Sequence, residues 1–446
     1  PAPSAPPTIA APAPEPGAPR WRAQPRRAHL SKRQPGRAAA SAHPGGGSDR
    51  APRNSEALEI MQRISVSERS GLAAAAAEHG FEYAASEGVT GWDESGYYQF
   101  TMAQIQDNLA APAEELEGFC FELVERAVND QAILERLGIA EPFWDYLAQS
   151  WRDGDKNLTG RMDLSYDGTG PAKLLEYNAD TPTALYETAV FQWEWLEQAA
   201  EEGLIPENCD QFNDVHEAIV QSFAAMSIEG IAHFACNTDI EDDKGTLEYL
   251  EECAKEAGLK THLLAMNDIG LDDWGKFTDT EEDVITTLVK LYPWEWIMDE
   301  EFGLKVPASR VRFIEPPWKA ILSNKGMLAL LWEMFEGHPN LLPTFFEGDA
   351  GADALAGTYV RKPLLGRQGA NIQMYRDGAL QGSSDGPYGD GGQIVQGCAP
   401  LPDCGGRYPL LGLWLIASKA AGLCIREGQS LITGPDARTV PHVILD

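Results

Sequence analysis

The chain has 446 residues, enough for two or three structural units around a large core, and a formal net charge of −33 at pH 7. Residues 1–53 hold nine Arg and Lys against two acids, which leaves a net charge of −40 on the remainder. A body this acidic repels phosphate backbones and favours cationic small molecules, which argues against nucleic-acid partners, and no apolar run is long enough to span a membrane.

The first 53 residues are rich in Pro, Ala, Gly and Arg and lack apolar periodicity, so we predict a disordered leader. An Arg-rich, acid-poor leader is also typical of a transit peptide. The seven cysteines are scattered without metal-ligand spacing, which favours a reduced, cytoplasmic protein.

Helical patterns then follow over residues 56–80, 102–128 and 130–150, and Pro112 is predicted to break the second of them. A Trp-bearing amphipathic helix is predicted over residues 185–200.

Two turn-flanked strands, residues 160–164 and 174–178, predict a hairpin with polar side chains on one face. Pairing without a bulge sets Arg161 opposite Asn178 and Asp163 opposite Glu176. Two carboxylates ~5 Å apart repel by roughly 3 kcal/mol at an effective dielectric of about 20, so something must neutralise them. A Mg²⁺ ion with these oxygen ligands is the simplest solution, and an exposed, solvated face is the alternative.

Residues 231–236, 243–257 and 261–266 read as strand, helix and strand, a βαβ unit without a dinucleotide-binding GxGxxG motif. The acidic loop 237–243 follows the first strand. It is either part of a ligand crevice at the strand end or a solvated helix N-terminus, and both interpretations stay open.

The last third combines lysines with a glycine-containing loop. A helix is predicted over 324–335 with Lys325 in its first turn, and strands over 358–362 and 372–375 flank Gly366 and Gly369. Lys362 ends the first of these strands. Glycines let backbone N–H groups approach phosphate oxygens and lysine supplies charge, so with the proposed Mg²⁺ site these residues predict a nucleoside-triphosphate site.

Further strands are predicted over residues 393–396, 411–418 and 422–426. Arg426 has apolar neighbours, so its charge needs either a ligand cleft or an acidic partner such as Glu427. Walker, HExxH and GxSxG motifs are absent from the sequence.

Together these segments resemble the glutathionylspermidine synthase family, in its stand-alone synthase-like branch. The resemblance covers about residues 59–446 and rests on several collinear motifs, namely Gly160–Asp163, Leu174–Thr183, Glu315–Lys319, Ser323–Lys325, Arg361–Pro363, Gly366–Asn371 and Gly386–Gly389.

The resemblance implies a mixed α+β and α/β fold, ATP-grasp-like, with a pre-ATP-grasp βαβ lobe and a helical N-terminal segment. We predict a substrate- and metal-binding region over 54–300 and a nucleotide-binding region over 301–446. The implied activity is ATP- and Mg²⁺-dependent amide formation through an acyl phosphate, from glutathione or a related peptide and a polyamine or other amine.

Site residues follow from the resemblance motif by motif. It implies metal ligation by Asp163, Glu176 and Asn178, contacts with the transferring phosphoryl group and acyl phosphate by Arg161 and Arg426, ATP binding by Lys325, Lys362, Gly369, Ala370 and Gln396, and substrate contacts by Thr181, Glu241 and Asp242.

The sequence departs from the synthases on the amine side. Asp242 stands where they have Glu, and Arg438 aligns with an acid that binds the polyamine. A ligase of different amine specificity and a non-catalytic nucleotide-binding descendant therefore stay open. The retained Arg161, Asp163 and Lys362 favour catalysis.

Overall fold

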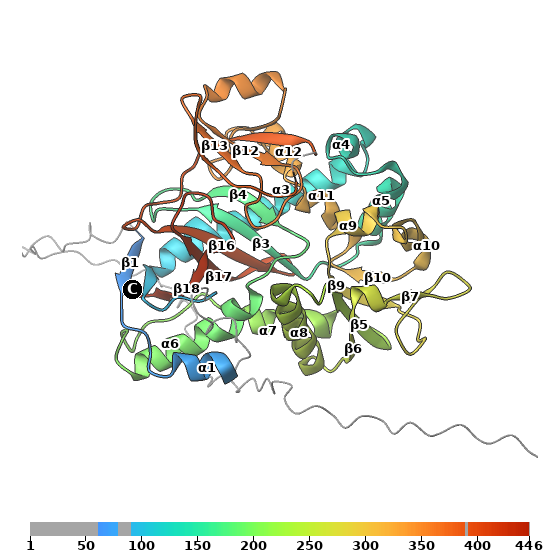
Figure 1. Cartoon of the computed structure of the whole chain (residues 1–446), viewed down its shortest axis with the longest axis horizontal. Coiled ribbons are helices and arrows are strands. Elements are labelled where there is room, and N and C mark those ends of the chain that lie inside the picture. The colour runs from blue at the N-terminus through green and yellow to red at the C-terminus, as the bar shows by residue number, and fades with distance from the viewer. Residues whose placement is uncertain (1–60, 79–90, 389–390, 446) are drawn as a thin grey trace, which may run out of the picture.

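The computed structural model describes residues 61–78, 91–388 and 391–445 (Figure 1). The predicted leader lies outside these ranges. All seven cysteines are free thiols. Within the described ranges, no helix has both the length and the apolar character needed to cross a bilayer.

The predicted carboxylate hairpin lies in an antiparallel sheet at the centre of the molecule, which we call the central sheet (Figure 1). Its strand order is β18-β17-β16-β3-β4. The strands are β3 (Thr159–Ser165), β4 (Lys173–Asn178), β16 (Tyr408–Ile416), β17 (Lys419–Gly428) and β18 (Arg438–Val440). Because β16 pairs with β3, this sheet joins residues from both predicted regions, 54–300 and 301–446.

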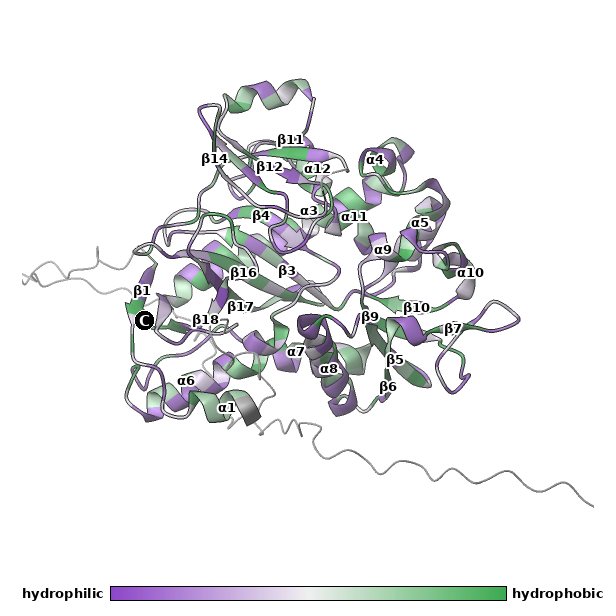
Figure 2. Cartoon of the chain, viewed as in Figure 1, coloured by the Kyte–Doolittle hydropathy of each residue, from purple (hydrophilic) through white to green (hydrophobic). Residues whose placement is uncertain are grey.

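The predicted βαβ unit is confirmed to within two residues at each boundary. It forms part of an all-parallel sheet of order β10-β9-β5-β6, which we call the parallel sheet. Its elements and neighbours are α7 (Val215–Ala225), β5 (Ile231–Cys236), α8 (Glu241–Glu256), β6 (Lys260–Ala265), β7 (Gly270–Leu271), β8 (Phe277–Thr278), β9 (Thr287–Leu291) and β10 (Arg312–Ile314). Figure 2 shows α8 largely in the hydrophilic colour, and its buried apolar residues include Leu247, Leu250 and Cys253.

A third sheet, the C-terminal sheet, holds the predicted glycine loop. Its strand order is β11-β15-β12-β13-β14, and α12 contacts β11 and β15. The elements are α12 (Gly326–Met334), β11 (Thr344–Phe346), β12 (Tyr359–Pro363), β13 (Gln373–Arg376), β14 (Ala379–Ser383) and β15 (Gln393–Gly397). Lys325 is the N-cap residue of α12 and not, as predicted, part of its first turn.

The remaining helices surround these sheets. They are α1 (Leu72–Glu78), α3 (Ala111–Ala127), α4 (Gln131–Arg136), α5 (Trp144–Asp153), α6 (Gln192–Glu201), α9 (Trp294–Asp299), α10 (Val306–Ser309) and α11 (Ala320–Ser323). Two further predictions were wrong. Pro112 does not break the chain's helical course, because it lies in the first turn of α3, where its missing N–H needs no partner.

The second wrong prediction concerns the helical pattern over 56–80, of which residues 56–60 and 79–80 lie outside the described ranges. Its part over α1 is helical, but its beginning is not. Residues 62–65 form a strand, β1 (Gln62–Ser65), antiparallel to β2 (Gly96–Phe100). β2 in turn runs parallel to β19 (His442–Ile444). Pairing with a distant strand, which local periodicity does not encode, decided the structure of this segment.

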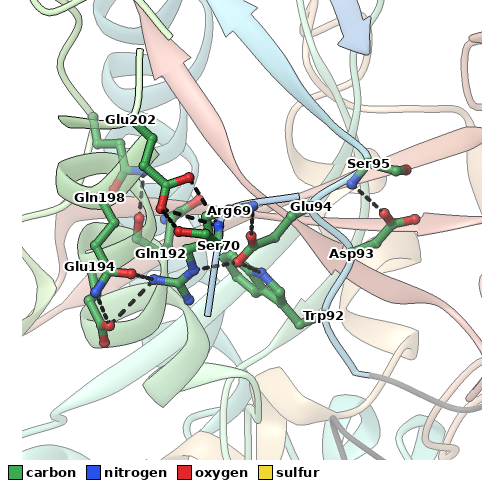
Figure 3. Close-up of polar contacts among 11 residues, drawn as sticks. Arg69, Ser70, Trp92, Asp93, Glu94, Ser95, Gln192, Glu194, Gln198 and Glu202 are labelled. Atoms are coloured by element: carbon green, nitrogen blue, oxygen red, sulfur yellow. Dashed lines mark hydrogen bonds and ion pairs between the residues drawn. The ribbon is translucent and has the colours of Figure 1, made fainter. Parts of the chain in front are cut away.

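Arg69 fastens the segment between β1 and α1 to α6 (Figure 3). Its guanidinium lies 2.9 Å from the Glu94 carboxylate and 3.4 Å from that of Glu194, and it donates to Gln198. Trp92 donates a further hydrogen bond to Glu94. Burial raises the pKa of Glu94 even though Arg69 is close. This buried ion pair is a structural anchor remote from the predicted site residues.

Candidate active site

A cavity of about 1340 Å³, including the part open to solvent, is lined by the β3–β4 hairpin, the loop after β12, the start of α9 and the segment between β17 and β18. These elements come from the central, parallel and C-terminal sheets or their connections (Figure 1). The charged residues that line the cavity are Arg161, Asp163, Glu176, Asp180, Glu295, Lys362, Arg367 and Arg426.

The hairpin has the predicted register at its functional end. Arg161 pairs with Asn178 and Asp163 with Glu176. A bulge follows Asp163, where the register shifts by one residue toward the turn. The bulge leaves both predicted pairs intact because it lies on the turn side of them.

Glu315 and Lys319 fix the start of β3. The Glu315 carboxylate accepts hydrogen bonds from the Thr159 N–H at 2.7 Å and the Leu158 N–H at 3.0 Å. Lys319 Nζ donates to the Thr159 carbonyl at 2.7 Å and lies 3.4 Å from Glu315. Both charged side chains are buried, so this pair holds the hairpin's first strand in place.

Protein cations already neutralise the two opposed carboxylates. Arg161 binds Asp163 through two nitrogens, at 2.7 and 3.1 Å, and Asn178 Nδ2 donates to the same carboxylate at 3.1 Å. Lys325 Nζ lies 2.8 Å from Glu176. Burial would raise the pKa of Glu176, but Lys325 outweighs it, so the pKa is lowered. The prediction that these acids need a metal ion to neutralise them was therefore wrong, because each acid has its own protein cation.

The donor set nevertheless fits Mg²⁺. Asp163, Glu176 and Asn178 face one another on neighbouring strands and line the cavity. Among the described residues, no group of three or more His, Cys, Asp or Glu side chains could hold a metal by itself. Mg²⁺ typically takes one or two carboxylates and completes its shell with water and substrate phosphates, so two acids and an amide suit it.

Lys325 and Lys362 converge on the hairpin from the C-terminal sheet. Lys325 Nζ also donates to the Gly366 carbonyl at 2.8 Å. Lys362 Nζ donates to the Leu175 carbonyl and to Gln396 Oε1, both at 2.7 Å. Burial lowers the pKa of Lys362 to about 8, although Glu176 opposes the shift. Lys362 lines the cavity, whereas Lys325 lies beside it against Glu176.

The glycine loop packs against the segment between β17 and β18. Gly369 has φ +70°, and a Cβ there would stand 2.4 Å from the Thr433 carbonyl oxygen. Only glycine therefore fits this position without moving the loop. Gly369 and Thr433 both line the cavity, whereas Ala370 is not a lining residue.

Arg426 faces the cavity, and the alternative of a pair with Glu427 is wrong. Successive strand side chains point to opposite faces. Glu427 instead accepts from Arg63 at 2.7 Å and Arg407 at 3.1 Å. Arg426 donates to the Gly434 carbonyl at 3.2 Å. Burial, with the like charge of Arg161, lowers the pKa of Arg426.

The structure places the predicted substrate residues in two different locations. Thr181 lines the cavity. Glu241 and Asp242 are exposed in the first turn of α8 and do not line it, and their substrate role stays a prediction. The next residue, Asp243, is buried and pairs with Arg367 at 2.9 Å. Of the two open interpretations of the acidic loop, the solvated helix N-terminus describes Glu241 and Asp242.

Sequence reasoning missed three charged residues of the cavity, Asp180, Glu295 and Arg367. Asp180 and Arg367 lie within the motifs Leu174–Thr183 and Gly366–Asn371. Their position beside predicted site residues in those motifs could have identified them. Glu295 lies between two tryptophans in a segment whose apolar character indicated only core.

A family model described as glutathionylspermidine synthase preATP-grasp matches residues 63–445. The chain belongs to this family. The match covers the central, parallel and C-terminal sheets, so the predicted resemblance and the ATP-grasp-like fold are confirmed.

Three proteins are similar to this chain over most of its length. A Haemophilus influenzae protein named "Putative acid–amine ligase" is 37% identical over 377 residues, covering 81% of this chain and 94% of that protein. Trypanothione synthetase of Crithidia fasciculata and the bifunctional glutathionylspermidine synthetase/amidase of Escherichia coli are each 27% identical, covering 72% and 80% of this chain. The matches span 53% and 60% of those two proteins.

Proposed function

We propose that this chain is an ATP-dependent carboxylate–amine ligase that forms an amide bond through an acyl phosphate. The observation that carries the proposal is the convergence of Arg161, Arg426 and Lys362 with two carboxylates and an amide in one cavity. The family to which the chain belongs, and the relatives described above, are named as synthetases and ligases.

The reaction needs two group transfers. A substrate carboxylate oxygen attacks the terminal phosphorus of ATP, an O–P bond forms, and ADP leaves. The amine nitrogen then attacks the carbonyl carbon, a C–N bond forms, the C–O bond to phosphate breaks, and the amine loses a proton. Both transfers build negative charge on phosphoryl and carbonyl oxygens, so positioned cations are the main requirement.

The chain's cations suit this requirement. We assign Arg161 and Arg426 to the transferring phosphoryl group and the acyl phosphate, because both line the cavity from β3 and β17, the two strands that flank β16 in the central sheet. Lys325 and Lys362 bind the ATP phosphates from the opposite side, and Gly369 supports the loop that covers them. Gln396 holds Lys362 through its Oε1 atom.

Asp163, Glu176 and Asn178 would hold Mg²⁺, which would neutralise phosphate charge when bound. Binding it requires Arg161 and Lys325 to share or release their carboxylates. Both cations then become available to phosphate oxygens.

Glutathione or a related γ-glutamyl peptide is the acid substrate that we favour, since the Escherichia coli relative and the family model are named for glutathionylspermidine synthesis. The amine is a polyamine or another cationic amine. Arg438, which aligns with a polyamine-binding acid of the synthases, does not line the cavity.

Purified chain with Mg-ATP, glutathione and a panel of spermidine, 1,4-diaminobutane and lysine tests the proposal. We expect phosphate release that depends on both acid and amine, with a conjugate seen by mass spectrometry. Tight ATP binding without turnover on any acid or amine would instead support a non-catalytic nucleotide-binding protein.

Asp163→Asn should lower phosphate release by on the order of 100-fold or more, because it removes a carboxylate from the metal and phosphate site. The matched control is Asp273→Asn, an exposed Asp in the β7–β8 hairpin. Circular dichroism should show both variants folded. Unchanged turnover in Asp163→Asn would refute the metal-site assignment.

A further inference from the structure

Glu295 is fixed at the edge of the cavity by buried neighbours. It is the second residue of α9, directly after Trp294, and lines the cavity together with Pro293. The Trp294 N–H donates to Asp180 Oδ2 at 2.9 Å, and Lys290 Nζ donates to Asp180 Oδ1 at 2.6 Å. Asp180, Lys290 and Trp294 are all buried. The backbone that carries Glu295 is therefore held in place before any substrate binds.

The Glu295 carboxylate differs from the other cavity acids in having no counterion of its own. Four acids line the cavity, and three are paired among the described residues: Asp163 with Arg161, Glu176 with Lys325 and Asp180 with Lys290. The fourth acid, Glu295, has no ion pair within the described ranges, and the hydrogen bond that its carboxylate accepts comes from its own backbone.

The cations near Glu295 are already engaged by other acids. The charges that act most strongly on it are Asp180, Lys290 and Arg367. Lys290 binds Asp180, and Arg367 binds Asp243 at 2.9 Å while lying 5.7 Å from the Trp296 ring centre. A carboxylate in a partly desolvated cavity, without a counterion, favours a ligand that brings a positive charge.

The cavity thus contains two charges that lack an oppositely charged protein partner among the described residues. Arg426 binds only a backbone carbonyl and suits an anion. Glu295 suits a cation. The two substrates of the second step carry these opposite charges: the acyl phosphate is an anion and the incoming amine is a cation. An alkylamine with a pKa near that of lysine (about 10.4) is an ammonium ion at neutral pH.

We propose that Glu295 receives the ammonium group of the amine substrate and sets the enzyme's preference for cationic amines. This inference rests on the ligase function proposed above. The carboxylate accepts hydrogen bonds from the ammonium group while its fixed backbone aims the nitrogen into the cavity. Glu295 contributes binding energy to the amine and none to ATP or to formation of the acyl phosphate.

Hydroxylamine provides a probe that separates the two half-reactions. It captures acyl phosphates as hydroxamates and is largely uncharged at about pH 7.5, unlike an alkylammonium ion. Glu295→Gln should lower kcat/KM for the best cationic amine of the panel by about 10- to 100-fold. Hydroxamate formation from glutathione and Mg-ATP, and the KM of glutathione, should stay within about twofold of wild type.

Asp299→Asn is the matched control, since Asp299 is exposed on the same helix. Glu295→Asp keeps the charge on a shorter side chain. It should show a smaller, equally selective loss, and it is measured in place of Glu295→Gln if that variant does not fold. A selective rise in the KM of glutathione would overturn the inference, because Glu295 would then recognise the acid substrate. So would unchanged amine kinetics.

Hydroxamate and conjugate formation by the wild-type chain distinguishes a failure of the proposed ligase function from a failure of the inference about Glu295. If it forms neither hydroxamate nor conjugate, the ligase function itself fails. If it forms hydroxamate but couples no cationic amine, only the inference about Glu295 fails.

Discussion

Arg426 and Glu427 are neighbours in sequence with opposite surroundings. Glu427 is buried among Arg63, Tyr98 and Arg407, which satisfy its carboxylate. Arg426 faces the cavity, where Arg161 is a like charge. Glu427 therefore contributes to folding. Arg426 is retained at a cost to folding and suits an anionic ligand.

Arg426→Ala should lower turnover by about 100- to 1000-fold without lowering the melting temperature, because it removes a cation from the cavity and relieves repulsion with Arg161. Arg407→Ala should do the reverse. It loses ion pairs to Glu427 and Asp93, so stability should fall by about 1 kcal/mol while kcat is retained. Steady-state kinetics and thermal unfolding of both variants test this. A large stability loss in Arg426→Ala would contradict it.

At the scale of elements, the glycine loop between β12 and β13 is constrained by the segment that packs against it, which contains Thr433. Two glycines of the C-terminal sheet, Gly369 and Gly378, have nearly the same positive φ, +70° and +76°. A Cβ on Gly369 would meet Thr433, whereas a Cβ on Gly378 would meet nothing within 4 Å. Comparing alanine substitutions at these two glycines therefore distinguishes the cost of a positive φ from the cost of a steric contact.

Gly369→Ala should raise the KM of ATP about tenfold, because the loop must move away from Thr433 and thus from the phosphates. Gly378→Ala should carry only the strain of a positive φ, roughly 1–2 kcal/mol of stability, with an unchanged KM. Kinetics with varied ATP and urea unfolding measure both effects. Equal changes in KM would refute a special role for the loop's contact.

At the scale of the whole molecule, His442 joins the last strand to α6 and to the segment that precedes α7. Its side chain is fully buried in β19. Nδ1 lies 2.8 Å from Gln192 Oε1 on α6, and Nε2 accepts the Phe212 N–H at 3.1 Å. One nitrogen must donate and the other must accept, so the ring is neutral. Burial lowers the pKa of His442 to about 3.

This lowered pKa predicts acid sensitivity. The unfolded chain takes up the proton near pH 6.5 and the folded chain only near pH 3, so stability is fully present above pH 6.5 and is lost as pH falls. The loss is about 1.4 kcal/mol per pH unit, or roughly 2 kcal/mol at pH 5. Urea unfolding at pH 7 and pH 5 should show a smaller loss for His442→Gln than for wild type. His262→Gln is the control, and an equal loss in all three proteins would contradict the prediction.

The sequence by itself determined the carboxylate hairpin and the βαβ unit, and in the hairpin also the face that each residue occupies. Alternation along β3 and β4, with a turn between them, was enough to place Asp163 opposite Glu176, because strand periodicity is local and has a period of two. The same holds for the βαβ unit, whose apolar runs and turns carry their own boundaries.

Only the tertiary structure decided which charges meet. Lys325, far along the chain, neutralises Glu176, and Glu427 turns away from Arg426 toward Arg63. Glu295 reaches the cavity because Asp180 binds the residue before it. Local patterns fix period and face, whereas an ion pair depends on where distant segments pack. The register of the hairpin was therefore readable from the sequence, and its counterions were not.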